Sequence, residues 1–534
     1  MRDGPVIEQG VDPKIDHIHL SLSTVDDATH RDRNDMARMG KSQQFKVNKY
    51  LPKLANGNPE EFSFHVDTRV YLYTDGNLGN STSNLGLVNG GQAGMVYIYI
   101  GTFVGFLFSV ISMAEIASLS PTSGGQYHWV SEYASPRYQK FLSYITGWLS
   151  VLGWQGGFAS ITFLCGTLVQ GFIALNNPTS YTPERWHGTL LTFAIALFAT
   201  FINTYAASQL PSLEGLILIL HIFGFFATMI PLWVMAERVD AKTVFTEFSN
   251  ISEWPSTGLA VLVGQIAPIF SFLGPDGATH IAEEIKDASK IVPWCMVATA
   301  LINGTLGFVI LITYLFTMGD LDTVLHPPSG FSFISAFNNA LGSAKGATAL
   351  ASLILVLEIC SAISILATCS RQAFAFARDN ALPFSSFFAN VNPKSKIPVN
   401  AVMFTTTVTL LLSLINIGST EAFNAIASLT VGSLYLSYIL SIGAFIARRL
   451  RPEPLPRARF SLGKFGLPIN IFAFFYLCFA IVFTFFPGQR HVTLQNMNWS
   501  VLVWGVVVVF AIVQYMVHGR KVYEGPVAYV QKAQ

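Results

Sequence analysis

The chain has 534 residues, of which 51% are hydrophobic and only 12% are charged, and its formal net charge is +1. Soluble globular proteins carry about 25% charged residues, so this composition indicates an integral membrane protein. The balanced charge provides no general attraction for nucleic acid, and the lack of a GxxxxGK[ST] loop argues against an ATP-driven pump.

The sequence divides into a membrane domain with a polar tail at each end. We expect residues 1–60 to be a disordered cytoplasmic tail, 61–93 a degenerate or partial first helix, and 518–534 a C-terminal tail. Between them, 94–517 holds eleven stretches that reach the roughly 20 apolar residues needed to cross a bilayer. These predicted spans are 94–113, 141–172, 188–210, 215–236, 258–283, 291–318, 346–370, 397–417, 422–447, 466–487 and 498–517.

Basic residues indicate how the spans are oriented. If the 118–140 loop is cytoplasmic, the inner loops and the C-terminal tail hold 17 Lys and Arg residues, whereas the outer loops hold five. Cytoplasmic loops are enriched in Lys and Arg, so we predict this orientation. Two glycosylation sequons, at Asn250 and Asn498, then fall on the outer side.

The same orientation indicates that one span is missing near the N-terminus. Eleven spans would leave the N-terminal tail outside with its ten Lys and Arg residues, whereas a twelfth span before Met95 would bring it inside. The only candidate stretch, Phe62–Gly91, contains Asp67, Arg69 and Asp75. A divergent gene model or an unusual splice form would explain the missing span.

The loop after the first predicted span, Met113–Val130, combines Glu115 with a Pro and Gly-Gly turn and an aromatic run. A carboxylate at the cytoplasmic end of a span, followed by such a turn, suggests a re-entrant gate element. The alternative is an ordinary interfacial loop whose Tyr127 and Trp129 belong to the aromatic belt of the membrane.

Trp154 and Gln155 lie in the next predicted span, 141–172, beside glycines that allow helices to approach closely. They either form an aromatic and polar wall that faces a substrate, or they pack against another helix. We include both among the predicted substrate-binding residues.

The 258–283 span is interrupted by a helix-breaking run. This run is Phe270-Ser271-Phe272-Leu273-Gly274-Pro275-Asp276-Gly277. Backbone that leaves the helix within a bilayer is tolerated only where it is buried in protein or lines a cavity. Broken helices of this kind supply the substrate site of secondary transporters, so we predict that these eight residues bind substrate. A kink that serves only packing is the alternative.

Four ionisable residues are candidates for proton coupling or gating besides Glu115. His280 and Glu284 follow the break four residues apart, which would place them on one helical face as a proton-responsive pair. The alternatives are a salt-bridged inner gate or simple solvation at the membrane interface. Glu358 lies in the middle of a span, where an ionisable group is costly, and is a proton site or a polar anchor. Arg371, with Arg378 and Asp379, suits an ion-pair network that latches a gate.

Taken together, several strings resemble the amino acid–polyamine–organocation superfamily of permeases, most closely the fungal amino acid/choline branch that includes GABA permeases. The resemblance covers roughly 85–520 and rests on the order and spacing of these strings. They are Asn89–Gly94, Ala114–Val130, Gly274–Gly277 with Glu283-Glu284 and Ala288–Pro293, and Ala375–Asp379 with Leu382-Pro383.

The resemblance implies an all-α polytopic fold with two inverted five-helix repeats of the LeuT type and two extra helices. Substrate would bind between broken helices one and six, with the third, eighth and tenth spans lining the pathway. Leu78–Gly91 could be the outer half of helix one, but the apolar inner half before it is absent, so helix one is incomplete in this chain.

The resulting functional hypothesis is secondary active transport of an amino acid, GABA, choline or a related amine, by proton symport or exchange. Its partners would be the small-molecule substrate, protons and the lipid bilayer, in the plasma membrane or the vacuolar membrane. The alternative is a non-transporting sensor, or an inactive splice form or paralogue that lacks helix one. We expect no enzyme activity, metal or cofactor, because no nucleophile motif or metal-spaced cluster is present and the five cysteines form no CxxC pair.

Overall fold

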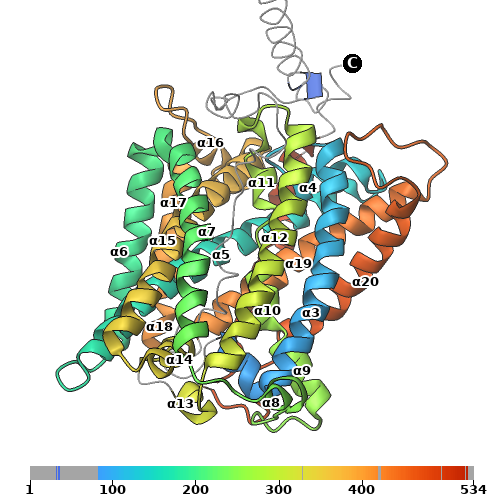
Figure 1. Ribbon diagram of the computed structural model, residues 1–534. Coiled ribbons are helices and arrows are strands. Elements are labelled where there is room, and N and C mark those ends of the chain that lie inside the picture. Colours follow the sequence, from blue (N-terminus) through green and yellow to red (C-terminus); the bar gives the residue numbers. More distant parts are fainter. Residues whose placement is uncertain are drawn as a thin grey trace, which may run out of the picture.

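The computed structural model describes residues 32, 34–35, 82–326, 329–418, 422–494, 496–523 and 525–526. This described part is helical, and eleven of its helices are long and apolar enough to cross a membrane, one for each predicted span (Figure 1). The predicted tail and the 61–81 part of the predicted first helix fall outside it, apart from the three N-terminal residues named above.

The helices follow one another as a bundle with short connections. In chain order they are α3 (Thr82–Leu119), α4 (Gln126–Tyr133), α5 (Gln139–Asn176), α6 (Arg185–Tyr205), α7 (Leu210–Met235), α8 (Ala241–Thr246), α9 (Thr257–Gly264), α10 (Ile266–Phe272), α11 (Gly277–His280), α12 (Ala288–Thr317), α13 (Leu321–Leu325), α14 (Ser332–Leu341), α15 (Ala344–Arg378), α16 (Ser385–Phe388), α17 (Val399–Ser413), α18 (Ile415–Gly418), α19 (Ala422–Arg449), α20 (Gly466–Thr484), α21 (Ser500–Gln514) and α22 (Arg520–Val522).

The first helix, α3, contains a sharp kink at Gly91, where φ is 67° and ψ is −167°. A Cβ at this position would lie 2.7 Å from the backbone nitrogen of Ser249, so only glycine fits. The kink separates a short stretch, 82–90, from a long membrane-spanning one. The short stretch corresponds to the expected outer half of helix one, and the long stretch is the first of the eleven spans.

The predicted interruption of the 258–283 span, which is the sixth helix of the family arrangement, is present, since α9, α10 and α11 are three short helices in place of one long one. The outer piece, α9, packs against the short stretch of α3. A Cβ on Gly264 would lie 3.2 Å from Cβ of Asn89, and one on Gly90 would lie 3.2 Å from Val261. The expected outer half of helix one and the outer piece of the broken helix are therefore neighbours, as the two-repeat arrangement requires, and α20 and α21 are the two additional helices.

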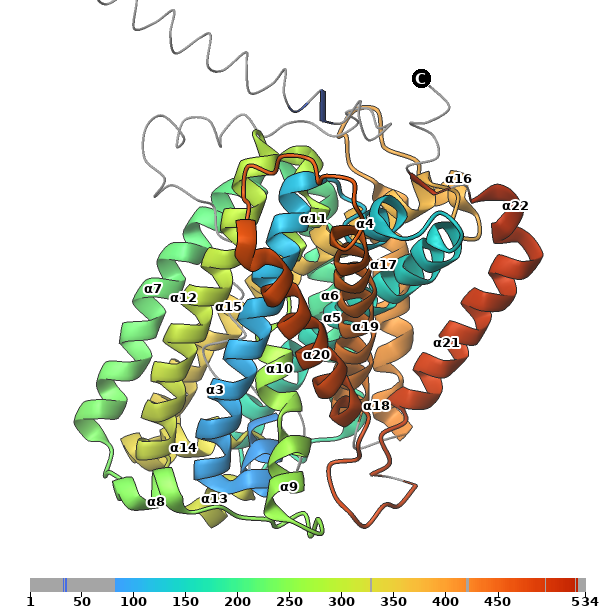
Figure 2. The same cartoon turned by 90° about the vertical axis from the view of Figure 1, so that its right-hand side faces the viewer.

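Loops predicted to share one side of the membrane lie together at one end of the bundle. At the end predicted to be cytoplasmic, called the inner end below, the Ser118 hydroxyl donates to the Ser289 carbonyl at 2.7 Å. At the opposite, outer end, the Asn84 amide donates to the Leu325 carbonyl at 3.1 Å. Figure 2 shows the same division, with α4, α11, α16 and α22 at one end and α8, α9, α13 and α18 at the other.

Asp32 of the N-terminal tail contacts the bundle. The Asp32 carboxylate accepts hydrogen bonds from the backbone nitrogens of Asp287 at 2.8 Å and Ala288 at 3.3 Å, at the start of α12. A carboxylate suits this position because a helix N-terminus presents unpaired N–H groups and a partial positive charge. Asp32 therefore lies at the inner end, whereas α3 begins at the outer end (Figure 1).

Helices differ strongly in how much of their apolar surface is covered by protein. The share of the apolar window that is buried is 78% in α19 and 72% in α5, against 11% in α21. The first two helices therefore form the centre of the bundle. The side chains of α21, such as Val506 and Val509, each 60% exposed, are left for lipid.

One of the two glycosylation sequons has a structural role. Asn498 is only 8% exposed, and its amide donates to the Ser428 hydroxyl at 3.1 Å and to the Phe486 carbonyl at 3.1 Å. These bonds fix the outer loop between α20 and α21. Because the Asn498 side chain is buried and bonded, this sequon gives no independent support for the predicted orientation.

Candidate functional site

The break in the sixth helix lies between α10 and α11. The helix ends at Phe272, and Leu273 is extended with ψ of 145°. Gly274 has φ of 120°, which side-chain-bearing residues rarely adopt, and its carbonyl accepts from the Gly277 nitrogen at 2.8 Å. Pro275 lies inside this turn, where its missing N–H removes no helical bond. The sequence run therefore produces a turn inside a membrane-spanning segment.

The residues before the turn are packed into the aromatic core. The Phe272 ring lies 5.1 Å from Tyr99 and 5.7 Å from Phe103, while the Phe270 ring lies 5.7 Å from Phe423. The Ser271 hydroxyl donates to the Ala267 carbonyl of its own helix at 3.1 Å. These predicted site residues hold the break in place through their side chains.

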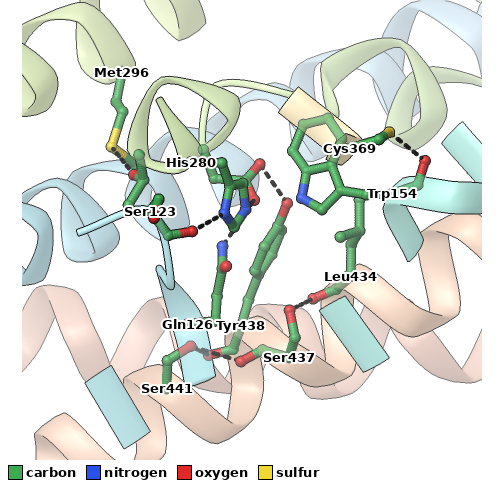
Figure 3. Close-up of polar contacts among 12 residues, drawn as sticks. Ser123, Gln126, Trp154, His280, Met296, Cys369, Leu434, Ser437, Tyr438 and Ser441 are labelled. Atoms are coloured by element: carbon green, nitrogen blue, oxygen red, sulfur yellow. Dashed lines mark hydrogen bonds and ion pairs between the residues drawn. The ribbon is translucent and has the colours of Figure 1, made fainter. Parts of the chain in front are cut away.

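The residue after the turn, Asp276, is a carboxylate with no exposed surface. One of its oxygens accepts from the Tyr438 hydroxyl at 2.7 Å, and the other accepts from the Gln126 amide at 2.7 Å. His280 Nε2 lies 3.9 Å from the second oxygen, and His280 Nδ1 lies 2.9 Å from the Ser123 carbonyl (Figure 3). Burying a carboxylate is costly unless it is hydrogen-bonded, and α4 and α19 supply these bonds.

Two further helices, α5 and α15, meet α19 at the turn, and these are the three spans that the family resemblance implied. From α5, the Trp154 ring meets His280 edge-on with a centroid distance of 5.5 Å. From α15, the Cys369 thiol donates to the Trp154 carbonyl at 2.9 Å (Figure 3). A Cβ on Gly277 would lie 3.1 Å from the Trp154 ring, so this glycine lets the indole approach the turn. Tyr438 from α19 completes the surroundings.

Two predicted site residues do not join this group. Gln155 is next to Trp154 in sequence, but its amide donates to the Thr405 hydroxyl on α17 at 3.1 Å, so it serves helix packing. Glu358 is fully buried in α15, ten residues before Thr368, which borders Gly277. Ten residues correspond to about 15 Å along a helix, so Glu358 is remote from the break.

The inner end below the break is held by two ion pairs that we call the inner latch. Arg378 contacts both oxygens of Glu283 at 2.8 Å, and Arg371 Nε donates to Glu284 at 2.8 Å. The Ser123 hydroxyl also donates to Glu283. The latch ties the inner half of the sixth helix to α15 and to the loop before α4.

The predicted pairing of His280 with Glu284 on one helical face is wrong. The α-helix ends at His280, Ile281 has φ of −104° and ψ of 8°, and a 3₁₀ turn follows over Ala282–Glu284. His280 consequently faces the turn, while Glu284 faces Arg371. Asp379 accepts a hydrogen bond from the Tyr127 hydroxyl at 2.9 Å, and its charge also acts on the neighbouring Arg378.

Segment Met113–Val130 is buried at the inner end of the bundle. Tyr127 and Trp129 have no exposed surface, which does not fit an aromatic belt at the membrane surface. Glu115 is 3% exposed, forms an ion pair with Arg449 at the inner end of α19, and accepts from the Leu462 nitrogen at 3.0 Å. Glu115 thus joins α3 to the end of α19 and the loop that follows it.

Sequence reasoning missed Gln126, Tyr438 and Ser123 as neighbours of the break. Each lies at least 150 residues from its partner in the sequence, so no local pattern signals the contact. Among the described residues, no group of three or more His, Cys, Asp or Glu side chains could hold a metal ion.

The known proteins to which this chain is similar are named as permeases or transporters. The family model described as "Amino acid permease" matches residues 72–507. A protein of Macrophomina phaseolina that is named for amino acid/polyamine transport is 33% identical over 78% of this chain and 92% of its own. The choline transporter of Saccharomyces cerevisiae is 32% identical over 83% and 78%, and amino-acid permease 2 of Neurospora crassa is 29% identical over 85% and 83%. A solved manganese transporter of Eremococcus coleocola aligns with a TM-score of 0.48 at 12% identity, over 90% and 97%.

Proposed function

The chain belongs to the amino acid permease family, and we therefore propose that it is a secondary transporter whose substrate carries an amino or quaternary ammonium group. Transport of amino acids or related compounds is common to the family. The narrower choice rests on the surroundings of the break. We further propose the plasma membrane as its location and proton symport or exchange as its mode.

The observation that carries the proposal is the buried carboxylate of Asp276 within the broken helix. A positively charged group placed at the turn would lie near this carboxylate and beside the Trp154 ring, whose face attracts cations. Choline and amino acids, the compounds in the names of two relatives, both carry such a group. Tyr438 and Gln126 would hold the carboxylate in position for it.

The inner latch supports an alternating-access role for this site. Its two ion pairs bind the inner half of the sixth helix to α15, and we propose that they close the path from the break to the inner end while they are formed. Release of substrate on the inner side would require these pairs to separate. In this proposal Arg371 and Glu284 act as the gate, and Glu115 with Arg449 anchors the neighbouring α3 and α19.

Uptake of labelled choline, GABA and a neutral amino acid into yeast lacking its own permeases tests the proposal. We expect the wild-type chain to accumulate at least one of them, and Asp276→Asn to reduce the uptake about tenfold or more, since a cation loses its buried counter-charge. Gln155→Leu is the matched control, because Gln155 faces α17. The KM of this variant for the transported substrate should stay unchanged.

The non-transporting alternative gives a different result. A chain that reaches the membrane but accumulates none of the three substrates would favour it. If uptake then appeared once a complete first helix from a relative replaced 36–81, the chain would be an inactive form of a transporter. Uptake by the unaltered chain that Asp276→Asn leaves intact would remove the carboxylate from the binding site.

A further inference from the structure

The chain after α21 folds back against the inner end of the bundle. A π-helical turn, Tyr515–Gly519, is followed by α22, and Tyr523 after it has no exposed surface. The Lys140 ammonium, at the start of α5, donates to the Arg520 carbonyl at 2.8 Å. We call Arg520–Tyr523 the C-terminal anchor.

The Tyr523 side chain belongs to a small apolar cluster that is separate from the main core. Its ring packs edge-on against Tyr144 of α5 at 5.3 Å and against Phe376 of α15 at 6.2 Å. Tyr127 of α4 belongs to the same cluster. The cluster thus joins the C-terminal anchor to α4, α5 and the inner end of α15.

A directed chain of hydrogen bonds runs from the anchor into α4. The Ser143 hydroxyl donates to the Tyr127 carbonyl at 2.7 Å, so its single proton is used there. The Tyr523 hydroxyl, 2.6 Å from the Ser143 oxygen, must therefore be the donor of that contact. The Tyr127 hydroxyl in turn donates to Asp379 at 2.9 Å.

Both tyrosines remain donors over the physiological pH range. Burial raises the pKa of Tyr523 and of Tyr127 well above the ordinary value of a tyrosine, and the nearby Asp379 carboxylate raises both further. Neither hydroxyl loses its proton near neutral pH, so the chain of bonds keeps its direction.

The end of this chain is adjacent to both parts of the proposed site. Tyr127 directly follows Gln126, which holds the Asp276 carboxylate, and Asp379 directly follows Arg378, which holds Glu283. A shift of α4 relative to α15 would therefore disturb the substrate site and the inner latch together.

We propose that Tyr523 is a positioning residue that holds α4 against α15 and so favours the closed state of the inner latch. This inference rests on the proposed role of the latch as the inner gate. Loss of the tail contact should increase the population that is open to the inner side. The outward-facing population then falls, which weakens the apparent affinity for external substrate without a loss of maximal rate.

Native Cys369 offers a reporter for this opening. It has no exposed surface and lies on α15 between Trp154 and the inner latch, so its thiol should react with a membrane-impermeant maleimide only when the inner end opens. The other cysteines, at 165, 295, 360 and 478, are replaced by alanine, and inside-out vesicles present the inner end to the reagent.

Tyr523→Phe removes one hydroxyl and keeps the ring. One hydrogen bond of typical strength corresponds to about a five-fold change in an equilibrium, so we expect Cys369 to react about five-fold faster and the KM for external substrate to rise by a similar factor. Tyr515→Phe is the matched control, because its ring also packs on Tyr144, at 5.2 Å, and it should change neither quantity. Tyr523→Ala should give a larger effect.

Arg371→Met separates failure of this inference from failure of the gate. If Arg371→Met accelerates the labelling of Cys369 but Tyr523→Phe leaves both the labelling rate and KM at the wild-type values, the anchor does not control the latch and the inference is wrong. If Arg371→Met also leaves labelling unchanged, the Arg371–Glu284 pair is not the inner gate, and the inference falls with it. Labelling requires no substrate, so its outcome is independent of which compound is transported.

Discussion

The two arginines of the inner latch differ in how deeply their partners are buried. Glu283, paired with Arg378, has no exposed side-chain surface, whereas the Glu284 side chain, paired with Arg371, is 26% exposed. Removing one partner of a buried pair leaves an uncompensated charge and costs about 3–5 kcal/mol, whereas a partly exposed pair contributes about 1 kcal/mol or less.

We therefore expect Arg378→Met to lower the thermal unfolding temperature of the detergent-solubilised protein markedly, and Arg371→Met to change it little. The double variant Arg378→Met with Glu283→Gln should recover part of the loss, because it removes the buried charge as well. Equal destabilisation by the two single arginine variants would contradict this difference in burial.

Glu358 remains a candidate proton site because an ionisable group buried within a span is rarely structural alone. Its distance from the break argues that it acts on coupling and not on substrate contact. We expect Glu358→Gln to reduce pH-dependent accumulation more than it reduces substrate binding, measured by uptake at several external pH values and by equilibrium binding. Unchanged pH dependence in this variant would show that proton coupling depends on another group, for which His280 is the next candidate.

At the scale of single residues, the sequence predicted which side chains are unusual but not what they face. Trp154 and Gln155 are adjacent, yet one faces the break and the other faces α17. A helix turns by about 100° per residue, and the direction of each face is set by tertiary packing. For the same reason Tyr438 was not predicted, since nothing near it in the sequence marks its contact with Asp276.

At the scale of elements, the break was predictable because glycine and proline act through local backbone geometry. The structure adds that Gly274 has φ of 120° and that Gly277 borders the Trp154 ring. Forcing side chains into such a backbone costs on the order of 1–3 kcal/mol. The sequence predicts that one helix continues to Glu284, but the structure has a 3₁₀ turn there. Glu283 and Glu284 of this turn pair with arginines that are distant in the sequence, and no local pattern signals these partners.

The triple variant Gly274→Ala, Pro275→Ala and Gly277→Ala should favour a continuous helix in the isolated span, because alanine is the strongest helix former. We expect transport to collapse nevertheless, since the turn that carries Asp276 would be lost. The measurements are uptake and surface expression, made in a variant that has a complete first helix. Normal substrate binding by a triple variant that reaches the membrane would show that the break is used only for packing.

At the scale of the whole molecule, the eleven spans were predictable because length and hydrophobicity suffice to identify them. The 17-to-5 distribution of basic residues adds an orientation that a cysteine in place of exposed Asn380 can test. We expect Asn380→Cys to react with an impermeant reagent only from the cytosolic side. If the reagent labels Asn380→Cys in intact cells, every span has the orientation opposite to the predicted one.

The positions of the chain before and after 36–81 bear on the missing span. Asp32 lies at the inner end and α3 begins at the outer end, so the segments on either side of 36–81 lie at opposite ends of the bundle. A tail on the inner side is what the basic residues predicted. Charge counting detects this discrepancy because topology alternates strictly, whereas hydrophobicity alone does not reveal it.

The sparse packing of α21 has a consequence for how the surrounding lipid acts on this protein. Only 11% of its apolar window is covered by protein, so few packing contacts oppose a change in its tilt when the hydrocarbon thickness changes. Its inner end nevertheless continues into the residues that hold α4. Reconstitution in lipids of increasing acyl length should therefore change the rate of Cys369 labelling in the wild type and less so in Tyr523→Phe. On this view the last helix makes the protein responsive to bilayer thickness.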